Sequence, residues 1–545
     1  MSRSTKASEH RLAAVNIRRR NHWGWGFEDQ RPDPAAIRAT AASLASHLGL
    51  RAGEVREPVP LERVSLRAPR VGAPAGLAEI CTSDAHARAC HAQGKSYADV
   101  VNAFNGRFDH PPDLVARPRD EEDLERLLEW CSSERVAAIP YGGGTSVVGG
   151  VSPSVGPSYN GAVSVDLCVF DRVLELDPIS RAARIQSGAP GPALEAQLGE
   201  HGFTLRHFPQ SFEFSTLGGW IATRAAGHFA TAKTHIEDFV ESVRAITPAG
   251  VWASRRLPGS GAGVSPDRML AGSEGTLGVI SEAWVRVQPR PAHRRSAGVR
   301  FESFAQGAEC VRAISQSGLQ PANCRLIDAR EARLTMAGDG AHALLVLGFE
   351  STDHEVDAAL ARALELCAEH GGSTSAGGNR AGADAVSSWR EAFLGAPYVR
   401  DVFVAMGVLS ETFETAITWE RFAAFHERVE AAAWEAVREV CGAQGLVSTR
   451  FTHVYPDGPA VYFTVLAPAT PGEEVAQWGH IKRAASDAVI AEGGTITHHH
   501  AVGRDHRPWY ERQRPDPFAR ALRAAKAAVD PAGIMNPGAL IEPLR

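Results

Sequence analysis

Three consecutive histidines, His498, His499 and His500, stand near the end of the chain. Histidine changes its protonation state near neutral pH, so such residues can accept or deliver a substrate proton, and they are also common metal ligands. Side chains alternate between faces along an extended strand, so three neighbours there cannot all reach one ion, and no second cluster with ligand spacing lies nearby. We therefore expect the triplet to orient or protonate the polar head of a substrate, and we expect no metal.

Two arginines and a tyrosine are further candidates for chemistry. Arg325 lies in the segment 323–327 and Arg400 in the segment 398–401. The planar fork of arginine suits bidentate binding of a phosphate or a carboxylate. Tyr462 lies in an apolar run, and as an acid or base it would need its pKa lowered by neighbouring cations. From the residues alone, surface or ion-paired arginines and a core tyrosine are the favoured interpretations.

A glycine-rich loop is suited to a phosphate-bearing ligand. Residues 140–146 read Pro-Tyr-Gly-Gly-Gly-Thr-Ser. Consecutive glycines turn tightly and bring bare N–H groups against a ligand, where they form a concave anion site. Val147 stands where a G-x-G-x-x-G motif needs its last glycine, and no Gly-Lys-Ser/Thr follows, so neither a Rossmann fingerprint nor a P-loop is present. The loop predicts a dinucleotide held by a different fold, although a glycine-rich surface turn is the simpler alternative.

Two further clusters of small and hydroxyl residues favour the dinucleotide. They cover residues 209–227 and 272–280. Three such clusters in this order suit a long ligand threaded between structural elements. The expected cofactor-binding residues are Pro140, Tyr141, Gly142, Gly143, Gly144, Thr145, Ser146, Gln210, Ser211, Ser215, Thr216, Gly219, Thr223, Arg224, Ala225, Glu274, Gly275, Thr276, Leu277, Gly278, Val279 and Ile280.

The order and spacing of these clusters resemble the FAD-binding flavoproteins of the vanillyl-alcohol-oxidase type. Within that group, the chain is similar to the alkyldihydroxyacetonephosphate synthase family, the flavoenzymes of ether-lipid synthesis. The resemblance extends from Trp23 to the C-terminus, and its clearest stretches are residues 213–220, 398–401, 411–415, 450–453 and 497–500. The chain departs from the family pattern at residues 148–150 and at Ala501.

The resemblance implies a cofactor, a reaction and roles for the candidate residues. FAD is expected to be bound non-covalently, because Thr145 stands where several related oxidases carry a histidine bonded to the flavin. The implied reaction exchanges the acyl group of acyl-dihydroxyacetone phosphate for a long-chain fatty alcohol without net redox change. Tyr462 would handle the proton at the reacting carbon, while Arg400, Arg325 and the three histidines would hold the phosphate and assist the leaving and entering groups.

Two other functions stay open at this point. The same fold commonly supports an FAD-linked oxidase or dehydrogenase of a 2-hydroxy acid, in which arginine and histidine grip a carboxylate. A flavin-binding protein without catalysis is the third possibility, and the combined arginine, tyrosine and histidine set argues against it.

The elements that must position these residues predict an α+β protein. A two-part FAD-binding domain of the vanillyl-alcohol-oxidase (PCMH) type is expected, with an α/β cap domain containing an antiparallel sheet. The expected parts are an N-terminal helical region with a basic arm (1–107), the FAD-binding domain (108–290), the cap or substrate domain (291–500) and a C-terminal segment returning to the FAD domain (501–545).

Local patterns predict individual elements of these parts. They indicate a helix over residues 120–131 capped by Asp120, and a hairpin turn at residues 247–250. A further set of strands, helices and a loop is expected in the cap: strands 297–301 and 343–349, helices 306–315, 355–369 and 421–441, and a loop at 371–384.

Bulk properties set limits on the function. A chain of 545 residues with 44% hydrophobic and 22% charged residues is typical of a globular protein with two or more domains. The net charge of −6 argues against nucleic acid as a partner. Eight scattered cysteines indicate reduced thiols, and neither a secretory signal nor a long apolar run is found. We expect a cytoplasmic enzyme of small lipid substrates, with peripheral membrane contact through its long-chain substrate and a homodimeric state implied by the resemblance.

Overall fold

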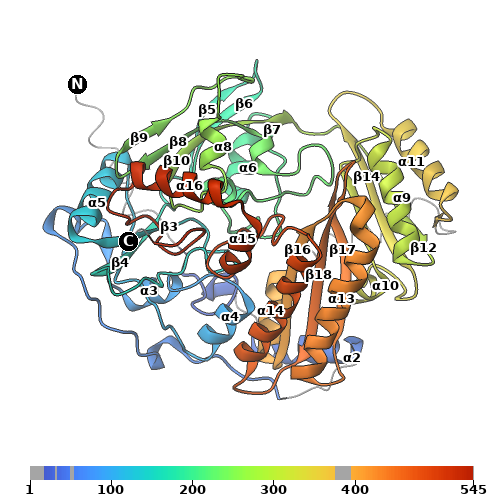
Figure 1. Ribbon diagram of the computed structural model, residues 1–545, viewed down its shortest axis with the longest axis horizontal. Coiled ribbons are helices and arrows are strands. Elements are labelled where there is room, and N and C mark those ends of the chain that lie inside the picture. The colour runs from blue at the N-terminus through green and yellow to red at the C-terminus, as the bar shows by residue number, and fades with distance from the viewer. Residues whose placement is uncertain (1–17, 31–32, 49–53, 375–394, 544–545) are drawn as a thin grey trace.

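The computed structural model describes residues 18–30, 33–48, 54–374 and 395–543. Most of the predicted basic arm and of the loop 371–384 lie outside these residues. The described chain forms two lobes that lie side by side (Figure 1). The first lobe contains residues 81–289, and the second contains residues 293–491.

The first lobe is built on two sheets. The smaller sheet has the strand order β1 (Cys81–Thr82), β2 (Leu114–Ala116), β4 (Gly161–Asp166) and β3 (Val136–Tyr141), in which β2, β4 and β3 are parallel. The larger is antiparallel, with the order β5 (Val173–Asp177), β6 (Ala182–Gln186), β10 (Val279–Arg286), β8 (Val240–Thr247) and β9 (Gly250–Ala253). Short helices α6 (Gly191–Gly199), α7 (Leu217–Thr223) and α8 (Pro266–Leu270) accompany it.

Local sequence signals account for several elements of the first lobe. Helix α5 (Glu121–Glu134) begins as predicted after Asp120, whose carboxylate accepts a hydrogen bond from the Asp123 N–H at 2.9 Å. The predicted hairpin turn is also confirmed, because Thr247 pairs with Gly250 where β8 and β9 meet. These elements carry the glycine loop, which follows directly after β3.

The second lobe is a seven-stranded antiparallel sheet. Its strand order is β15 (Ser373–Thr374), β12 (His293–Phe301), β14 (Ala343–Ser351), β13 (Asn323–Ile327), β17 (Leu446–Val454), β18 (Pro459–Pro468) and β16 (Val408–Ala416). The helices that pack with it are α9 (Phe304–Gln316), α10 (Ala329–Leu334), α11 (Asp357–Glu369), α13 (Trp419–Cys441) and α14 (Glu474–Ala491). The predicted antiparallel sheet with covering helices is confirmed.

The two faces of this sheet differ in chemistry. On β18 the side chains of Val461, Phe463 and Val465 belong to the hydrophobic core of the lobe. Tyr462 lies between them and points to the opposite face, because successive side chains of a strand alternate. On the neighbouring strands, Arg450 and Glu414 stand directly opposite Tyr462 in register. The sheet therefore buries one apolar face under its long helices and presents a polar face to the first lobe.

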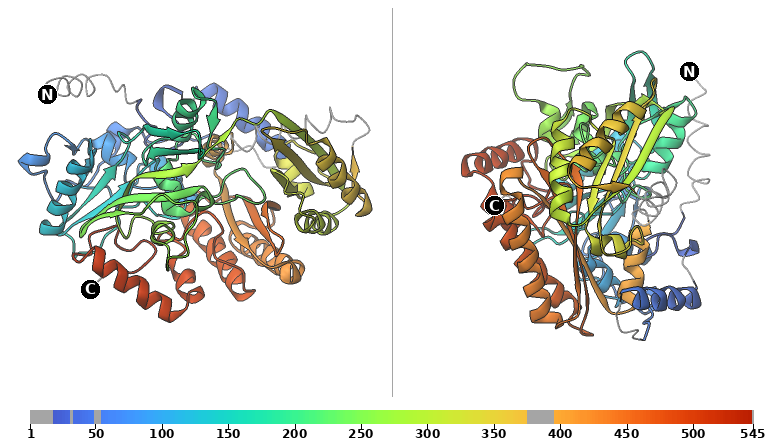
Figure 2. Two further views of the ribbon diagram at one scale, coloured as in Figure 1. Left: turned by 90° about the horizontal axis from the view of Figure 1, so that it is seen from above. Right: turned by 90° about the vertical axis from the view of Figure 1, so that its right-hand side faces the viewer.

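The two ends of the chain join the lobes. After α15 (Arg507–Gln513) and α16 (Asp516–Val529), the chain returns to the first lobe, where Met535 forms a β-bridge with Ala138 (Figures 1 and 2). Near the N-terminus, Trp23 packs edge-on against Phe104 of α4 (Tyr97–Phe104), with ring centroids 5.0 Å apart. None of the helices in the described ranges is long and apolar enough to cross a membrane.

Candidate active site

One cavity runs from the first lobe to the polar face of the second. At one end it is lined by the glycine loop after β3 and by residues of the two other small-residue clusters. At the other end it is lined by a set of polar side chains, namely Arg325, Arg400, Thr412, Arg450, Thr452, His453, Tyr462, His499 and His500. The cavity thus brings together residues that lie more than three hundred positions apart in the sequence.

The glycine loop fits a ligand that approaches the backbone closely. Gly144 has φ of +68°, a conformation that side chains rarely adopt. A Cβ atom at Gly143 would lie 2.1 Å from the carbonyl oxygen of Phe214, so no larger residue fits there. Within the described residues, the backbone N–H groups of 142–147 donate no hydrogen bond to the protein itself. Bare N–H groups that share a cavity wall form the concave donor site that a pyrophosphate needs.

Most of the expected cofactor-binding residues line this cavity, but three do not. Arg224 ends α7 in a left-handed conformation, and its exposed side chain pairs with Glu237. Thr276 is buried and donates its hydroxyl to the Ser273 carbonyl at 2.7 Å. Leu277 belongs to the hydrophobic core of the first lobe. The side chains of these three positions therefore do not line the cavity, because a run of small residues does not reveal which of its side chains turn inward.

Tyr462 stands between cations at the second-lobe end of the cavity. The Arg450 guanidinium lies over its ring, 3.7 Å from the centroid, and also pairs with Glu331. Burial raises the pKa of Tyr462 above its usual value, and the positive charges of Arg450 and Arg400 offset only part of this effect. The cations therefore lower the pKa of this phenol, as expected from the sequence, but burial outweighs them, and Tyr462 keeps its proton at neutral pH in the ligand-free protein.

The two predicted arginines reach the cavity from different elements. Arg325 lies on β13, on the same face of the sheet as Arg450, and donates to the His228 carbonyl at 3.3 Å. Burial and the charge of Arg450 lower the pKa of Arg325 to about 9. Arg400 comes from a helical stretch, residues 395–405, and donates to the Lys95 carbonyl. Together these arginines make this end of the cavity strongly cationic.

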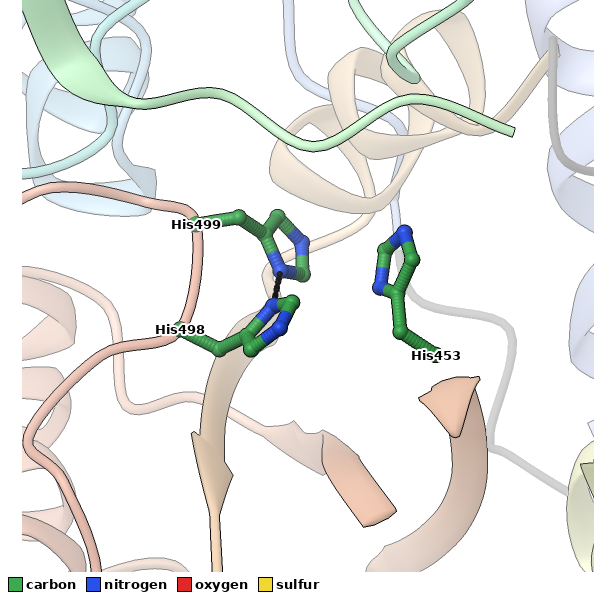
Figure 3. A group of neighbouring side chains, drawn as sticks. All are labelled: His453, His498 and His499. Carbon is green, nitrogen blue, oxygen red and sulfur yellow. Dashed lines mark hydrogen bonds between the residues drawn. The ribbon is translucent and has the colours of Figure 1, made fainter. Parts of the chain in front are cut away.

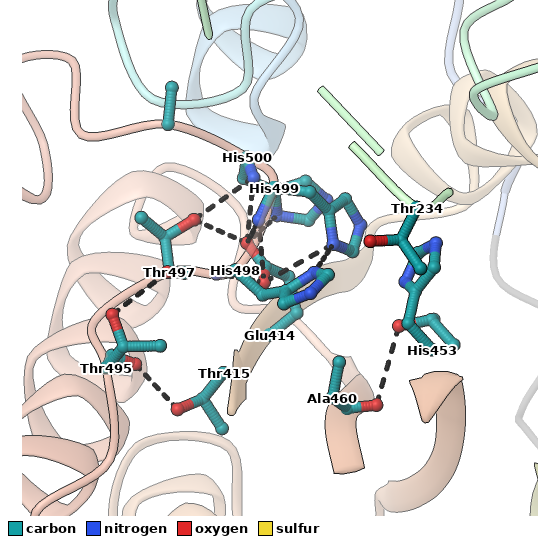
Figure 4. Close-up of polar contacts among 12 residues, drawn as sticks. Thr234, Glu414, Thr415, His453, Ala460, Thr495, Thr497, His498, His499 and His500 are labelled. Atoms are coloured by element: carbon teal, nitrogen blue, oxygen red, sulfur yellow. Dashed lines mark hydrogen bonds and ion pairs between the residues drawn. The ribbon is translucent and has the colours of Figure 1, made fainter. Parts of the chain in front are cut away.

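The histidine triplet lies on a series of bends and not on a strand. The strand argument against a shared ligand therefore does not apply to it. Instead, its backbone wraps around the buried carboxylate of Glu414 on β16 (Figure 4). This carboxylate accepts hydrogen bonds from the N–H groups of His498, His499 and His500. It also accepts one from the hydroxyl of Thr497.

A second buried carboxylate holds the other end of the same loop. Glu274, from the third small-residue cluster, accepts hydrogen bonds from the N–H groups of Val502 at 2.9 Å and Gly503 at 2.7 Å. Its burial raises its pKa to about 7, although these two N–H groups favour the charged form. The loop 497–503 is therefore attached to the second lobe through Glu414 and to the first lobe through Glu274.

The rings of the triplet face different partners. His499 and His500 line the cavity, and the ring centroids of His499 and Tyr462 are 6.1 Å apart. His498 lies behind them, where its Nε2 atom bonds the Tyr455 hydroxyl at 2.7 Å. Burial lowers the pKa of all three imidazoles, and for His498 and His499 the lowering is large. The rings are therefore neutral at physiological pH.

Sequence reasoning did not single out four residues that the structure adds to the site. They are Arg450, His453, Glu414 and His235, whose Nε2 atom lies 2.9 Å from the His498 carbonyl oxygen. A signal for two of them was available, because Arg450 and His453 lie on β17, a strand rich in β-branched and aromatic residues that neighbours the strand of Tyr462. That the side chains of Arg450 and Tyr462 face each other can be predicted only when the register between these strands is known.

Comparisons with known proteins agree with this geometry. A family model described as "FAD binding domain" matches residues 112–254, and one described as "FAD linked oxidases, C-terminal domain" matches residues 290–540. The first match contains the glycine loop and the second contains the polar face of the seven-stranded sheet. The protein is an FAD-linked flavoenzyme of the vanillyl-alcohol-oxidase type.

Comparisons with individual proteins over most of the chain identify a family within this type of flavoenzyme. The chain is 31% identical to alkyldihydroxyacetonephosphate synthase of Caenorhabditis elegans over 498 residues, which cover 85% of this chain and 81% of the relative. It is 30% identical to the synthase of Dictyostelium discoideum, with 86% and 80% covered. A solved structure of an alkyldihydroxyacetonephosphate synthase superposes with a TM-score of 0.78 at 25% identity, covering 95% of this chain and 98% of the other. The chain belongs to the alkyldihydroxyacetonephosphate synthase family.

Proposed function

We propose that this protein exchanges the acyl group of an acyl-dihydroxyacetone phosphate for a long-chain fatty alcohol, giving the ether-linked product and a free fatty acid. The observation that carries the proposal is the position of Tyr462, which lies against the buried guanidinium of Arg450 and beside the ring of His499 in the cavity that the glycine loop lines at its other end. The named relatives are synthases of this kind. The reaction moves no net electrons, so it needs no external oxidant.

The arginines are proposed to bind the phosphate of the substrate. Burial and the charge of Arg450 lower the pKa of Arg325 to about 9, so it stays positively charged at neutral pH but holds that charge less firmly than a free arginine does. A phosphate dianion beside it would favour the charged form again, so substrate binding and arginine protonation support each other. Arg400 lines the same cavity from the helical stretch 395–405, and a pair of arginine forks matches the several oxygens of a phosphate.

The histidines and Tyr462 are proposed to manage the protons. In the exchange, the bond between the substrate carbon and the acyl oxygen breaks, and a bond from that carbon to the alcohol oxygen forms. The alcohol proton has to leave, and a neutral imidazole of His499 or His500 can accept it. The proton at the reacting carbon also has to leave and return: a neutral imidazole can accept it, and Tyr462, which holds its proton, can donate one back to the carbon. When bound, FAD supplies an electron-accepting ring to that carbon.

We also propose that the flavin is held without a covalent bond. Thr145 lines the cavity at the glycine loop, and its hydroxyl offers a hydrogen bond but no ring nitrogen for attachment. The histidines that line the cavity lie at its other end, on the second lobe and the loop 497–503. Acid precipitation of the yellow protein should therefore release free FAD into the supernatant. Flavin that stays with the pellet would contradict this attachment mode.

Anaerobic turnover tests the exchange. Purified holoenzyme is mixed with an acyl-dihydroxyacetone phosphate and a long-chain alcohol without any electron acceptor, and the products are measured by mass spectrometry. The proposal predicts ether product and free fatty acid in equal amounts over many turnovers. If neither forms and small 2-hydroxy acids bleach the flavin instead, the protein is an FAD-linked dehydrogenase on the same fold.

A further inference from the structure

A cluster of three imidazoles lies beside the cavity, where His453 of β17 meets the rings of His498 and His499 (Figure 3). One nitrogen of each ring lies within 4.8 Å of the others. The Nδ1 atoms of His498 and His499 are 3.0 Å apart and share a hydrogen bond, so one of them carries a proton in the metal-free protein. Segments 45 residues apart in the chain thus direct three nitrogen atoms toward one point.

The Nδ1 atom of His453 is available as a ligand, and those of His498 and His499 become available when the proton that they share leaves. The Nε2 atom of His453 lies 2.9 Å from the Gly227 carbonyl oxygen, so it carries the hydrogen and leaves the lone pair on Nδ1. This Nδ1 atom is buried and has no hydrogen-bond partner among the described residues. His498 has its Nε2 atom on the Tyr455 hydroxyl, which leaves its Nδ1 facing His499. In His453 and His498, the Nε2 atom that faces away from this point is hydrogen-bonded to the protein. Such an outer hydrogen bond orients the ring of a histidine that binds a metal.

The spacing of the rings matches a tetrahedral centre. With zinc–nitrogen bonds of about 2.0–2.1 Å and a ring centroid about 1.1 Å beyond the nitrogen, two ligating imidazoles have centroids about 5 Å apart. The three observed separations are 4.9 Å for His453 and His498, 5.6 Å for His453 and His499, and 5.3 Å for His498 and His499. Small rotations of the rings would close this arrangement around one ion.

We propose that His453, His498 and His499 form a binding site for a divalent transition-metal cation, with Zn²⁺ as the best match to three imidazole nitrogens. His453 and His499 line the cavity, so the fourth position opens toward the substrate space and takes water or a substrate oxygen. A bound ion occupies the lone pair of His499, one of the two proposed proton acceptors. If the proposed exchange reaction is correct and His499 is the acceptor, the ion inhibits the reaction, and a chelator restores it.

Metal binding to the holoenzyme is measured first, in the absence of any lipid substrate, so the result does not depend on the proposed reaction. The protein is dialysed against a chelator and then titrated with Zn²⁺ by calorimetry. A parallel titration with Co²⁺ follows absorption at wavelengths longer than those of the flavin. The proposal predicts one saturable site and a cobalt spectrum of a four-coordinate centre. Absence of saturable binding of both ions to the wild-type protein overturns it.

Variants locate the site. Each of His453→Gln, His498→Gln and His499→Gln removes one ligand, and each should weaken binding by more than about 100-fold, which exceeds the usual effect of losing an outer partner. Tyr455→Phe removes only the outer partner of His498 and should weaken binding by about 10- to 100-fold. His480→Gln, at a surface histidine paired with Glu439, is the control and should leave binding unchanged.

Flavin content and thermal unfolding show which of these variants are folded, and only those are compared. Tyr455→Phe keeps the test informative if the ligand variants unfold, because it removes only a hydroxyl group and leaves all three imidazoles in place. Wild-type affinity in every folded ligand variant and in Tyr455→Phe would refute the site. Loss of binding in His480→Gln would also refute it, by placing the ion at the surface.

Discussion

Replacing Glu414 by glutamine tests whether the buried carboxylate positions the histidines. Its Oε1 atom accepts hydrogen bonds from the Thr497 hydroxyl and from the His500 N–H at 2.8 Å. Its Oε2 atom accepts them from the N–H groups of His498 and, at 3.1 Å, His499. The glutamine amide has nearly the same shape, but its NH₂ group must face one of these two pairs of donors. Two hydrogen bonds to a charged acceptor are lost, at about 1.5–3 kcal/mol each.

The loop 497–503 would therefore lose about 3–6 kcal/mol of the energy that holds its position. The expected FAD-binding residues lie on the first lobe and Glu414 lies on the second, so Glu414→Gln should still bind FAD. Its kcat should fall at least about 100-fold, because a displacement of about 1 Å in a catalytic group costs that much. Flavin absorbance, thermal unfolding and steady-state turnover are measured on the same preparation.

Glu430→Gln is the matched control, since it removes a carboxylate of the same lobe that pairs with Arg330 away from the loop. It should keep wild-type turnover. Thr497→Val removes a single hydrogen bond to Glu414 and should give a smaller fall in kcat, which keeps the test usable if Glu414→Gln does not fold. Full activity in a folded, flavin-loaded Glu414→Gln would refute the positioning role.

Three further predictions concern other parts of the molecule. Tyr462→Phe should keep FAD and lose turnover by about 100-fold or more, and retained activity would remove the phenol from the mechanism. Gly143→Ala should lose bound flavin, because its Cβ would lie 2.1 Å from the Phe214 carbonyl oxygen. Gly156→Ala has open space around it and should keep its flavin. Equal flavin content in the two variants would contradict the proposed fit of the glycine loop to the cofactor. Asp113 is buried, but hydrogen bonds from Arg70 and Arg67 outweigh burial and hold its pKa at about 2. Its folded pKa is below the unfolded value, so its contribution of about 2–3 kcal/mol is present at neutral pH and is lost as the pH falls from about 4 toward 2. Thermal unfolding of Asp113→Asn should therefore start lower at neutral pH and change less with acid, and an unchanged acid dependence would contradict this assignment.

Much of the fold could be predicted from local signals. The cap of α5 at Asp120 and the hairpin at residues 247–250 depend on neighbouring residues, and both were predictable without tertiary information. The strand and helix alternation of the second lobe was equally clear, because apolar residues recur with the period of each element. The long helix predicted at 421–441 begins only two residues earlier, at Trp419.

The site was harder to predict because its geometry depends on contacts between distant segments. Whether Arg450 faces Tyr462 depends on the register of β17 and β18, which the sequence does not state. The shape of the histidine loop depends on Glu414, more than eighty residues earlier in the chain. For Arg224 the sequence suggested a role that its side chain does not have: it lies in the small-residue cluster 209–227, but its side chain turns outward and pairs with Glu237. Local patterns therefore identified the reactive residue types, and the strand register decided which of them meet.

Oxygen labelling tests the central claim most directly. The holoenzyme is supplied with an acyl-dihydroxyacetone phosphate and a long-chain alcohol whose hydroxyl carries ¹⁸O, and the products are analysed by mass spectrometry. The proposed exchange breaks the bond between the substrate carbon and the acyl oxygen, so the label should appear in the ether product and the released fatty acid should be unlabelled. Label in a fatty ester, with free dihydroxyacetone phosphate as the second product, would mean that the alcohol attacks the acyl carbonyl and would contradict the account.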